Sequence, residues 1–281
     1  MSTSNRVPSK LFSVAMAKGH QSIFQPGQQD IHWLGLEILR LNTGEGWQGK
    51  FGDKEAALVI LCGRCTVSVN NGREFKWERL GGRDNIFNGA STAVYVPRMS
   101  EVSVTAENGL EMALVEAPCE TDLPPVLITP GDVKIISAGV ANWRRDVRLI
   151  IPPGSPISQR LIIGETINPA GNWSGIPPHK HDEISEKENY LEELYFYKTR
   201  PANGYAVQLI YRDHQAQAHM IGNDDVMVFP NGYHPTVAAP GTTLCYLWVL
   251  AGGDKAYKVG TDPRFDWVDN AETVIKEMKH Q

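Results

Sequence analysis

The chain has 281 residues, of which 42% are hydrophobic and 21% charged, as is ordinary for a globular protein long enough for two medium domains. Its net charge of −5 and pI of about 5.9, without a basic stripe, argue against a nucleic-acid surface. No apolar run could span a bilayer, and the N-terminal residues lack the apolar stretch of a signal peptide. With only four cysteines, we expect a cytoplasmic protein that binds neither nucleic acid nor membrane.

The first part of the chain predicts an arm followed by an antiparallel β domain. Residues 1–30 are polar and interrupted by Gly and Pro, so we interpret them as an N-terminal arm. Over residues 31–120, β-branched and aromatic runs alternate with Gly and Asn turns, and residues 44–49 form a turn cluster. The expected strands are 31–39, 56–62, 66–69, 75–77, 92–97, 102–105 and 110–117.

The pair Cys62 and Cys65 forms a C-x-x-C motif, which could be a redox or metal half-site. The motif lies inside a β-branched run, and no second C-x-x-C follows it. We therefore interpret the two cysteines as small residues of a strand and its turn.

Pro and Gly residues then interrupt the pattern, which predicts a linker over 121–145 and a second β domain over 146–262. The expected strands of this domain are 146–151, 159–163, 194–197, 205–211, 217–220, 225–229 and 243–250. Only the tail, 263–281, is predicted to contain a helix. We expect Asn270 as its N-cap, with Val274, Ile275 and Met278 as a narrow apolar stripe.

The two β domains resemble each other in the order of their features. A Gly/Trp or Asn/Trp turn begins each of them, at Gly46–Trp47 and at Asn172–Trp173, and each has a late strand that ends in Pro. Many short strands with Gly and Pro turns are typical of sandwiches and barrels. The sequence therefore predicts an all-β protein of two similar barrels with a short C-terminal helix.

Only the second domain carries a candidate metal site. His179 and His181 are two residues apart, which places both imidazoles on one face of a strand. Glu193 follows in an aromatic run, and His234 follows a Pro–Asn–Gly turn. Three histidines and a carboxylate form a plausible set of ligands for a divalent metal with room left for substrate.

The carboxylate ligand is not unique on the residues alone. Glu186, Glu188 and Glu192 are rivals of Glu193. Glu193 shares a strand face with Tyr195, whereas Glu192 lies on the opposite face, and period two alone cannot tell which face is inside.

These residues resemble the two motifs of the cupin superfamily in a two-cupin chain. The combination Pro–Pro–His179–Lys–His181–Asp, Leu–Glu–Glu193–Leu–Tyr–Phe–Tyr and Pro–Asn–Gly–Tyr–His234–Pro is similar to the 5-deoxy-glucuronate isomerase family of inositol catabolism. That family is related to the 5-keto-4-deoxyuronate isomerase of pectin breakdown. The resemblance implies a bicupin of two tandem double-stranded β-helix (jelly-roll) barrels, in which only the C-terminal cupin binds metal.

The resemblance also implies the chemistry. The ligands would be His179, His181, Glu193 and His234, and the reaction would convert 5-deoxy-D-glucuronate to 5-dehydro-2-deoxy-D-gluconate, an aldose–ketose shift. No electron transfer is needed, so zinc is favoured, while manganese or iron would also fit. Such an enzyme is expected to be a homo-oligomer.

The base and the group that binds the substrate carboxylate remain open on the sequence. Candidates for the base are Glu193, Tyr195 and Tyr233, with Glu192 and Tyr197 as alternatives. The cations available for the carboxylate are Lys180, Lys198 and Arg212, together with the group Arg144, Arg145 and Arg148. Two other functions stay open: a metal-dependent cupin dioxygenase or decarboxylase, and a non-catalytic cupin that binds a sugar acid.

Overall fold

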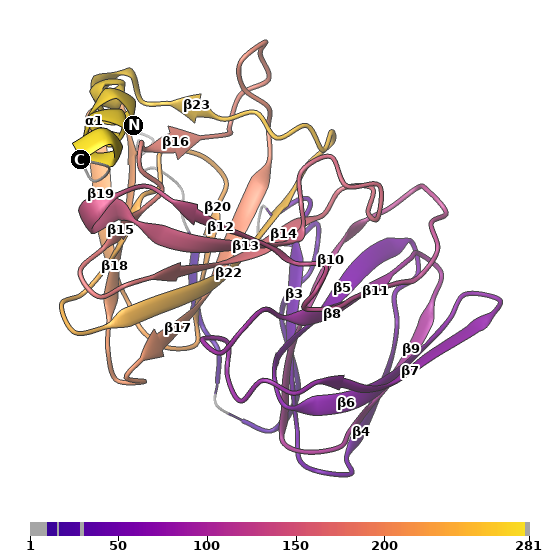
Figure 1. Ribbon diagram of the computed structural model, residues 1–281. Coiled ribbons are helices and arrows are strands. Elements are labelled where there is room, and N and C mark those ends of the chain that lie inside the picture. Colours follow the sequence, from indigo (N-terminus) through magenta and orange to yellow (C-terminus); the bar gives the residue numbers. More distant parts are fainter. Residues whose placement is uncertain (1–9, 16, 29–30, 279–281) are drawn as a thin grey trace, which may run out of the picture.

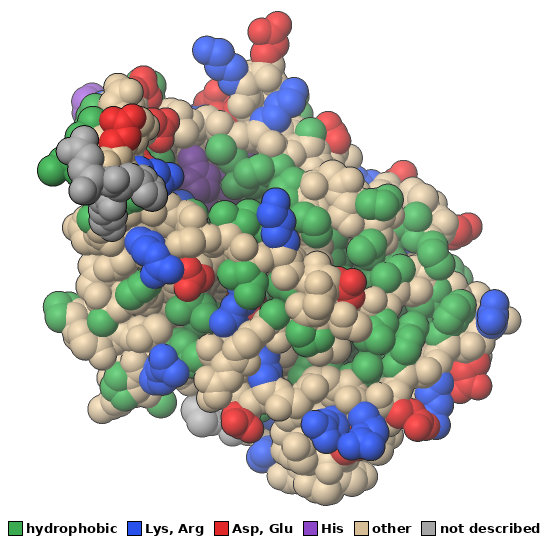
Figure 2. All heavy atoms as spheres, viewed as in Figure 1, with side chains coloured by type: hydrophobic (Ala, Val, Ile, Leu, Met, Phe, Trp, Pro, Cys, Tyr) green, Lys and Arg blue, Asp and Glu red, His purple; other side chains and the backbone are tan. Residues whose placement is uncertain are grey.

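The computed structural model describes residues 10–15, 17–28 and 31–278, and it is built almost entirely of antiparallel strands (Figure 1). Two barrel-like halves lie side by side, each made of one large and one small sheet. No helix within the described ranges is long and apolar enough to cross a membrane. On the face seen in Figure 2, basic and acidic side chains are interspersed rather than gathered by sign.

The N-terminal half packs a six-stranded sheet, in the order β11-β8-β5-β10-β3-β2, against a four-stranded sheet, in the order β4-β9-β6-β7. Its strands are β2 (Gly19–Phe24), β3 (Gly35–Leu41), β4 (Gly46–Lys50), β5 (Lys54–Cys62), β6 (Arg64–Asn70), β7 (Glu74–Gly81), β8 (Thr92–Val96), β9 (Glu101–Ala106), β10 (Leu110–Pro118) and β11 (Val126–Ile128). The space between these sheets is filled by buried apolar side chains such as Leu58, Val104 and Met112. This interior therefore has the composition of a core rather than of a site.

The C-terminal half packs a seven-stranded sheet, in the order β1-β20-β17-β22-β14-β13-β12, against a four-stranded sheet, in the order β15-β21-β18-β19. The first strands are β1 (Lys10–Ser13), β12 (Lys134–Ala138), β13 (Arg145–Ile151), β14 (Ile162–Asn168), β15 (Trp173–Ser174) and β16 (His179–Lys180). The remaining strands are β17 (Glu192–Arg200), β18 (Ala206–Arg212), β19 (Gln215–Ile221), β20 (Asp225–Phe229), β21 (Thr236–Ala238), β22 (Thr243–Ala251) and β23 (Gly260–Thr261). Its interior differs from that of the first half because it is lined by the aromatic side chains Tyr195, Tyr197, Phe229 and Tyr246.

The two large sheets pack face to face and join the halves through one continuous apolar core. Strand β17 is buried on both faces: Leu194 and Phe196 belong to this joint core, while Tyr195 and Tyr197 point into the C-terminal barrel. Buried carboxylates strengthen the junction. Glu55, for example, is fully buried and accepts hydrogen bonds from three successive backbone N–H groups at residues 159–161.

The predicted all-β class, with two tandem barrels and a short C-terminal helix, is confirmed, but several local predictions are wrong. Residues 44–49 include strand β4 instead of being only a turn, and the stretch 121–145, expected as a linker, contains β11, β12 and the short 3-10 helix η1 (Ala141–Trp143). Both β11 and β12 are edge strands. Edge strands need no apolar alternation, so the sequence signal for them is weak.

The helix also begins earlier than predicted. A 3-10 turn, η2 (Pro263–Phe265), leads into α1 (Trp267–Met278), so Asn270 lies inside the helix. The residue that caps this region is Asp262, whose side chain accepts a hydrogen bond from the backbone of Arg264. Val268 is the buried residue of α1, whereas Val274 and Met278 of the expected stripe are exposed.

The C-x-x-C cysteines lie on two strands joined at a turn, as interpreted: Cys62 ends β5 and Cys65 is the second residue of β6. Both are free thiols, and burial raises the pKa of each. They therefore stay protonated and unreactive at neutral pH.

Candidate metal centre

Three side chains from different parts of the C-terminal half converge at one point. The ligand atoms of His181, Glu193 and His234 all lie within 4.8 Å of one another, and all three residues are buried. Nε2 of His181 is 3.1 Å from Oε2 of Glu193, and Nε2 of His234 is 3.0 Å from the same oxygen. His181 directly follows β16, Glu193 is the second residue of β17, and His234 lies in the turn after β20.

Backbone carbonyls fix the orientation of both imidazoles. Nδ1 of His181 is 2.6 Å from the carbonyl oxygen of Leu191, and Nδ1 of His234 is 2.8 Å from that of Gly232. A carbonyl can only accept, so each Nδ1 carries the hydrogen and donates it. When a ring is neutral, its Nε2 turns a lone pair toward the Glu193 carboxylate; when the ring is protonated, Nε2 donates a hydrogen bond to that carboxylate. A divalent cation satisfies such a set of donors, and this second hydrogen bond is the usual support of a metal-bound histidine.

His179 lies beside this group but is not part of it. Its ring centroid is 5.2 Å from that of His234 and 6.4 Å from that of His181, while its Nδ1 lies 3.4 Å from the carbonyl of Pro177. Burial, followed by the neighbouring His234, lowers the pKa of His179 to about 3. Its imidazole is therefore neutral at physiological pH, which is the form a metal requires.

The carboxylate of Glu193 is ionised. Burial alone would raise its pKa, but the hydrogen bonds to His181 and His234 outweigh burial and bring the pKa to about 2. For His181, burial lowers the pKa, while Glu193 raises it by more. The protein thus supplies an anionic oxygen that attracts either protons or a metal ion to the same two imidazoles.

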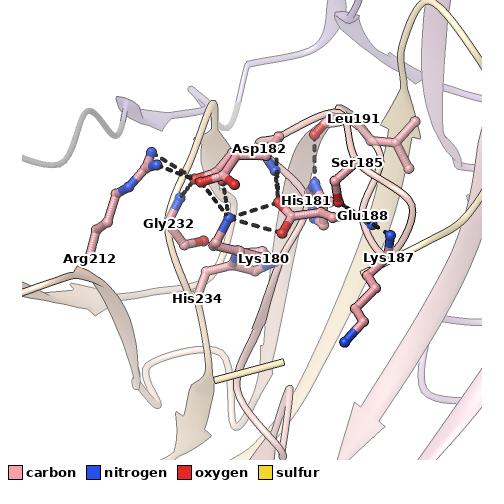
Figure 3. Close-up of polar contacts among 11 residues, drawn as sticks. Lys180, His181, Asp182, Ser185, Lys187, Glu188, Leu191, Arg212, Gly232 and His234 are labelled. Atoms are coloured by element: carbon pink, nitrogen blue, oxygen red, sulfur yellow. Dashed lines mark hydrogen bonds and ion pairs between the residues drawn. The ribbon is translucent and has the colours of Figure 1, made fainter. Parts of the chain in front are cut away.

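A second carboxylate, Asp182, holds the two histidine segments together (Figure 3). Its Oδ1 accepts a hydrogen bond from Nζ of Lys180 at 2.6 Å, and its Oδ2 accepts from Arg212 at 3.1 Å and from the backbone N–H of Gly232 at 2.8 Å. The carbonyl of Gly232 in turn holds Nδ1 of His234. The residue next to His181 therefore fixes the turn that presents His234.

The segment 182–191 separates His181 from Glu193 and is closed by Glu188. This carboxylate accepts from Lys180 at 2.9 Å and from the backbone N–H groups of Asp182 and Glu183 at 2.7 and 3.0 Å. These contacts hold the Glu188 carboxylate away from the cluster of His181, Glu193 and His234, which is called the metal group below. Glu192, another rival ligand, points to the opposite face of β17, where the backbone N–H groups of residues 32 and 33 donate to it at 2.7 Å.

Three of the cations available for the substrate carboxylate are engaged with acids. Lys180 and Arg212 belong to the network around Asp182. Lys198 lies on the face of β17 opposite Glu193 and pairs with Glu111 at 2.8 Å and with Asp224 at 2.6 Å. The structure does not bring Lys198 to the metal group; it places this lysine in the junction between the halves.

The two predicted catalytic tyrosines lie in different places. Tyr195 shares the face of Glu193, its ring centroid is 6.2 Å from that of His234, and its hydroxyl has no hydrogen-bond partner among the described residues. Burial raises the pKa of Tyr195 well above its ordinary value, so it keeps its proton. Tyr233 instead stacks on Tyr211, with ring centroids 5.2 Å apart, to one side of the group.

Sequence reasoning missed Tyr257, whose hydroxyl is affected by the Glu193 carboxylate, whereas it counted Arg145 among the cations available for the substrate carboxylate. Burial and then the Glu193 carboxylate raise the pKa of the Tyr257 hydroxyl, while Arg145 opposes them. Tyr257 lies in an irregular segment between β22 and β23, and Arg145 lies in an Arg–Arg pair at the start of β13. The position of Tyr257 carries no sequence pattern that would have indicated the site.

Comparison with known proteins places the chain among sugar-acid isomerases. Residues 12–268 match the KduI/IolB family. A protein of Geobacillus kaustophilus (strain HTA426) named 5-deoxy-glucuronate isomerase is 36% identical over 251 residues, which cover 88% of this chain and 90% of that protein. Its namesake from Bacillus subtilis (strain 168) is 31% identical over 85% of this chain and 89% of that protein.

Solved structures agree with these matches. An IolB-like protein from Salmonella typhimurium LT2 superposes with a TM-score of 0.87 at 30% identity, covering 92% of this chain and 98% of that chain. Oxalate decarboxylase of Lactobacillus farciminis superposes with a TM-score of 0.67 at 13% identity, covering 98% of this chain and 93% of that chain. The second likeness is one of fold alone.

Proposed function

The chain belongs to the KduI/IolB family and is an isomerase, and from this premise we propose that it converts 5-deoxy-D-glucuronate to 5-dehydro-2-deoxy-D-gluconate in myo-inositol catabolism. The observation that carries the proposal is the match to relatives of that name along nearly the whole chain. The buried group of His181, Glu193 and His234 adds the chemistry such a reaction needs. The likeness to oxalate decarboxylase is restricted to fold and does not support an oxidative reaction.

We propose that His181, Glu193 and His234 hold a divalent metal, with His179 as the fourth ligand. The neutral state of His179 and the shared orientation of the other two rings support this set. When bound, the metal supplies Lewis acidity that stabilises negative charge on the carbonyl and hydroxyl oxygens of the substrate. The reaction transfers no electrons to or from the metal, so zinc is the favoured ion, and the donors would also accept manganese or iron.

The reaction must also move two protons. A hydrogen leaves the carbon that bears the hydroxyl and one is returned to the neighbouring carbonyl carbon, while the hydroxyl proton passes to the former carbonyl oxygen, so the atoms balance within one molecule. Glu193 is ionised, and its Oε1 has no hydrogen-bond partner within the described ranges, so we assign it the role of proton acceptor. Tyr195 keeps its proton and faces the same interior, so it is suited to donate a hydrogen bond to a substrate oxygen.

Exclusion of water supports this assignment. Tyr195, Phe229 and Tyr246 pack around the group, with Tyr195 4.8 Å from Phe229 and 4.4 Å from Tyr246 between ring centroids. In such surroundings a charge on the substrate interacts strongly with fixed protein groups. We further propose that the enzyme acts in the cytoplasm as a homo-oligomer.

A proton NMR time course in D₂O, under air-free conditions, tests the reaction. With 5-deoxy-glucuronate as substrate, we expect the keto acid to form without oxygen, with at most one deuterium incorporated at the carbon that receives the proton. A product that needs oxygen, or that releases carbon dioxide, would show that the isomerase proposal is wrong. An unchanged sugar in the presence of metal-loaded protein would point to a binding protein.

A further inference from the structure

Trp248 is a residue of the barrel wall that keeps access to solvent. On β14, β17 and β22, every second side chain points into the C-terminal barrel, as Tyr195 and Tyr246 do. The structure describes these three strands completely, and among their inward-pointing residues Trp248 alone is partly exposed. The others, Glu193 included, are buried. The free space over these strands therefore borders the indole of Trp248.

The indole of Trp248 rests against β14 and is fixed there. A Cβ added to Gly164 would overlap Cζ2 and Cε2 of the indole, so the ring occupies the room that a side chain would need at this position. Nε1 of Trp248 donates a hydrogen bond to Oγ1 of Thr166 at 3.0 Å. With its position and its N–H both fixed, the ring can offer a ligand only its apolar surface.

This surface lies within reach of the metal group. Trp248 is two residues along β22 from the position that pairs with Glu193 on β17. Two residues of strand and one strand spacing place the Cα atoms of Glu193 and Trp248 about 8 Å apart. Trp248 also packs against the buried cluster that contains Leu191, whose carbonyl oxygen holds Nδ1 of His181. Six carbons joined by bonds of about 1.5 Å span about 6 Å, so a sugar acid at the metal group reaches the indole.

The polar groups beside the indole are already paired. Its own N–H is engaged by Thr166, and the hydroxyl of Tyr246 is 2.6 Å from that of Ser174. A methylene group placed on the indole gains from its burial. A hydroxyl group placed there loses its hydrogen bonds to water and finds no replacement among these residues. The surface therefore distinguishes the two groups.

We propose that the indole of Trp248 supports the carbon chain of the sugar acid and selects for a methylene at C5. The inference rests on the proposed function and deepens it by naming a residue that determines specificity. In 5-deoxy-glucuronate, C5 carries no hydroxyl and lies about 5 Å along the chain from the aldehyde carbon. With the aldehyde at the metal group, C5 lies over the indole. Glucuronate carries the additional hydroxyl for which this surface has no partner.

The experiment compares two unreactive acids by calorimetry, namely the open-chain alcohols obtained by reducing the aldehyde of 5-deoxy-glucuronate and of glucuronate. They differ only in the hydroxyl at C5, and neither can isomerise or close to a hemiacetal ring. The proteins are zinc-loaded wild type, Trp248→Phe and Trp248→Gln. Trp47→Gln is the matched control, because Trp47 is also partly buried but packs against the core of the N-terminal barrel. Bound zinc and the melting temperature are recorded for each protein.

We expect the wild type to bind the 5-deoxy acid about 10- to 100-fold more tightly than the hydroxylated acid, the range that an apolar surface can achieve against one hydroxyl. Trp248→Phe should keep most of this preference because it keeps an apolar ring. Trp248→Gln should lose it, because its amide can pair with the hydroxyl, while bound zinc stays at the wild-type value. Trp47→Gln should keep the wild-type preference. Equal binding of the two acids by the wild type, or an unchanged preference in Trp248→Gln, would overturn the assignment.

Turnover of 5-deoxy-glucuronate, measured beside the calorimetry, separates failure of the proposed function from failure of this inference. If the wild type prefers the 5-deoxy acid and Trp248→Gln does not, but no keto acid forms, the isomerase proposal is wrong and the role of Trp248 stands. If keto acid forms and the wild type binds the two acids equally, the role of Trp248 is refuted and the isomerase proposal stands. Binding of neither acid also refutes the role of Trp248.

Discussion

Replacement of Asp182 by Ala should weaken metal binding although Asp182 is not a ligand. The side chain is buried and accepts from Lys180, Arg212 and the N–H of Gly232, and the carbonyl of Gly232 holds His234. Loss of a hydrogen bond to a charged group costs about 1.5–3 kcal/mol. Second-sphere partners of this kind change metal affinity by about 10- to 100-fold. We therefore expect a rise in the zinc dissociation constant within that range.

Competition with a chromophoric chelator measures this affinity, and the d–d absorption of the Co²⁺-loaded protein reports ligand geometry. Asp182→Asn should retain more affinity than Asp182→Ala, because the amide oxygen can still accept from Gly232. Glu183→Ala is the matched control: Glu183 pairs with Lys180 and Arg212, is half exposed, and does not touch the His234 turn. Wild-type affinity and an unchanged Co²⁺ spectrum in Asp182→Ala would refute the positioning role.

Three further predictions concern charge and stability. Lys198→Met leaves Glu111 and Asp224 without one of their cations at the junction between the halves. Urea unfolding should therefore show a free energy of unfolding lower by about 3–5 kcal/mol, with metal binding retained. An unchanged urea midpoint would refute this. In the metal-free protein, the pKa of Glu193 is lowered from 4.5 to about 2. The ionised carboxylate therefore contributes its full stabilisation of the folded state above pH 4.5, and this stabilisation is lost as the pH falls toward 2. Thermal melts across that range should show a steeper loss in the wild type than in Glu193→Gln, and parallel curves would contradict the assignment. Burial lowers the pKa of Lys255 from 10.5 to about 8, so between these pH values the unfolded state binds more protons than the folded state. The free energy of unfolding should therefore rise with pH from 8 to 10.5. Lys255→Met should remove that rise, and a rise that persists in the variant would contradict the assignment to Lys255.

The sequence could predict the site because its residues are tied to local patterns. His181 and His234 stand in short motifs rich in Pro and Gly, and Glu193 begins a strand with period two. The sequence pattern could not tell which face of this strand points into the barrel. The answer came from packing, since Leu194 and Phe196 enter the core between the halves while Glu193 and Tyr195 face the barrel interior.

Ion pairs between residues that are far apart in the chain could not be predicted from the sequence. Lys198 carries the positive charge expected of a group that binds the substrate carboxylate, but it pairs with Glu111 of the other half, 87 residues away in the chain. Lys180 and Arg212 are likewise occupied by a carboxylate beside His181. Edge strands such as β12 and the start of α1 were also missed, because exposed edges and a 3-10 entry to a helix carry little periodic signal.

The most direct test of the account is metal-dependent turnover of 5-deoxy-glucuronate without oxygen. Metal-free wild type and His181→Ala are each titrated with zinc under air-free conditions, and bound zinc and keto acid are measured together. The account predicts that wild-type turnover rises with zinc to one ion per chain, while His181→Ala loses both zinc and turnover. Turnover in the metal-free wild type, or in a variant that no longer binds zinc, would contradict it.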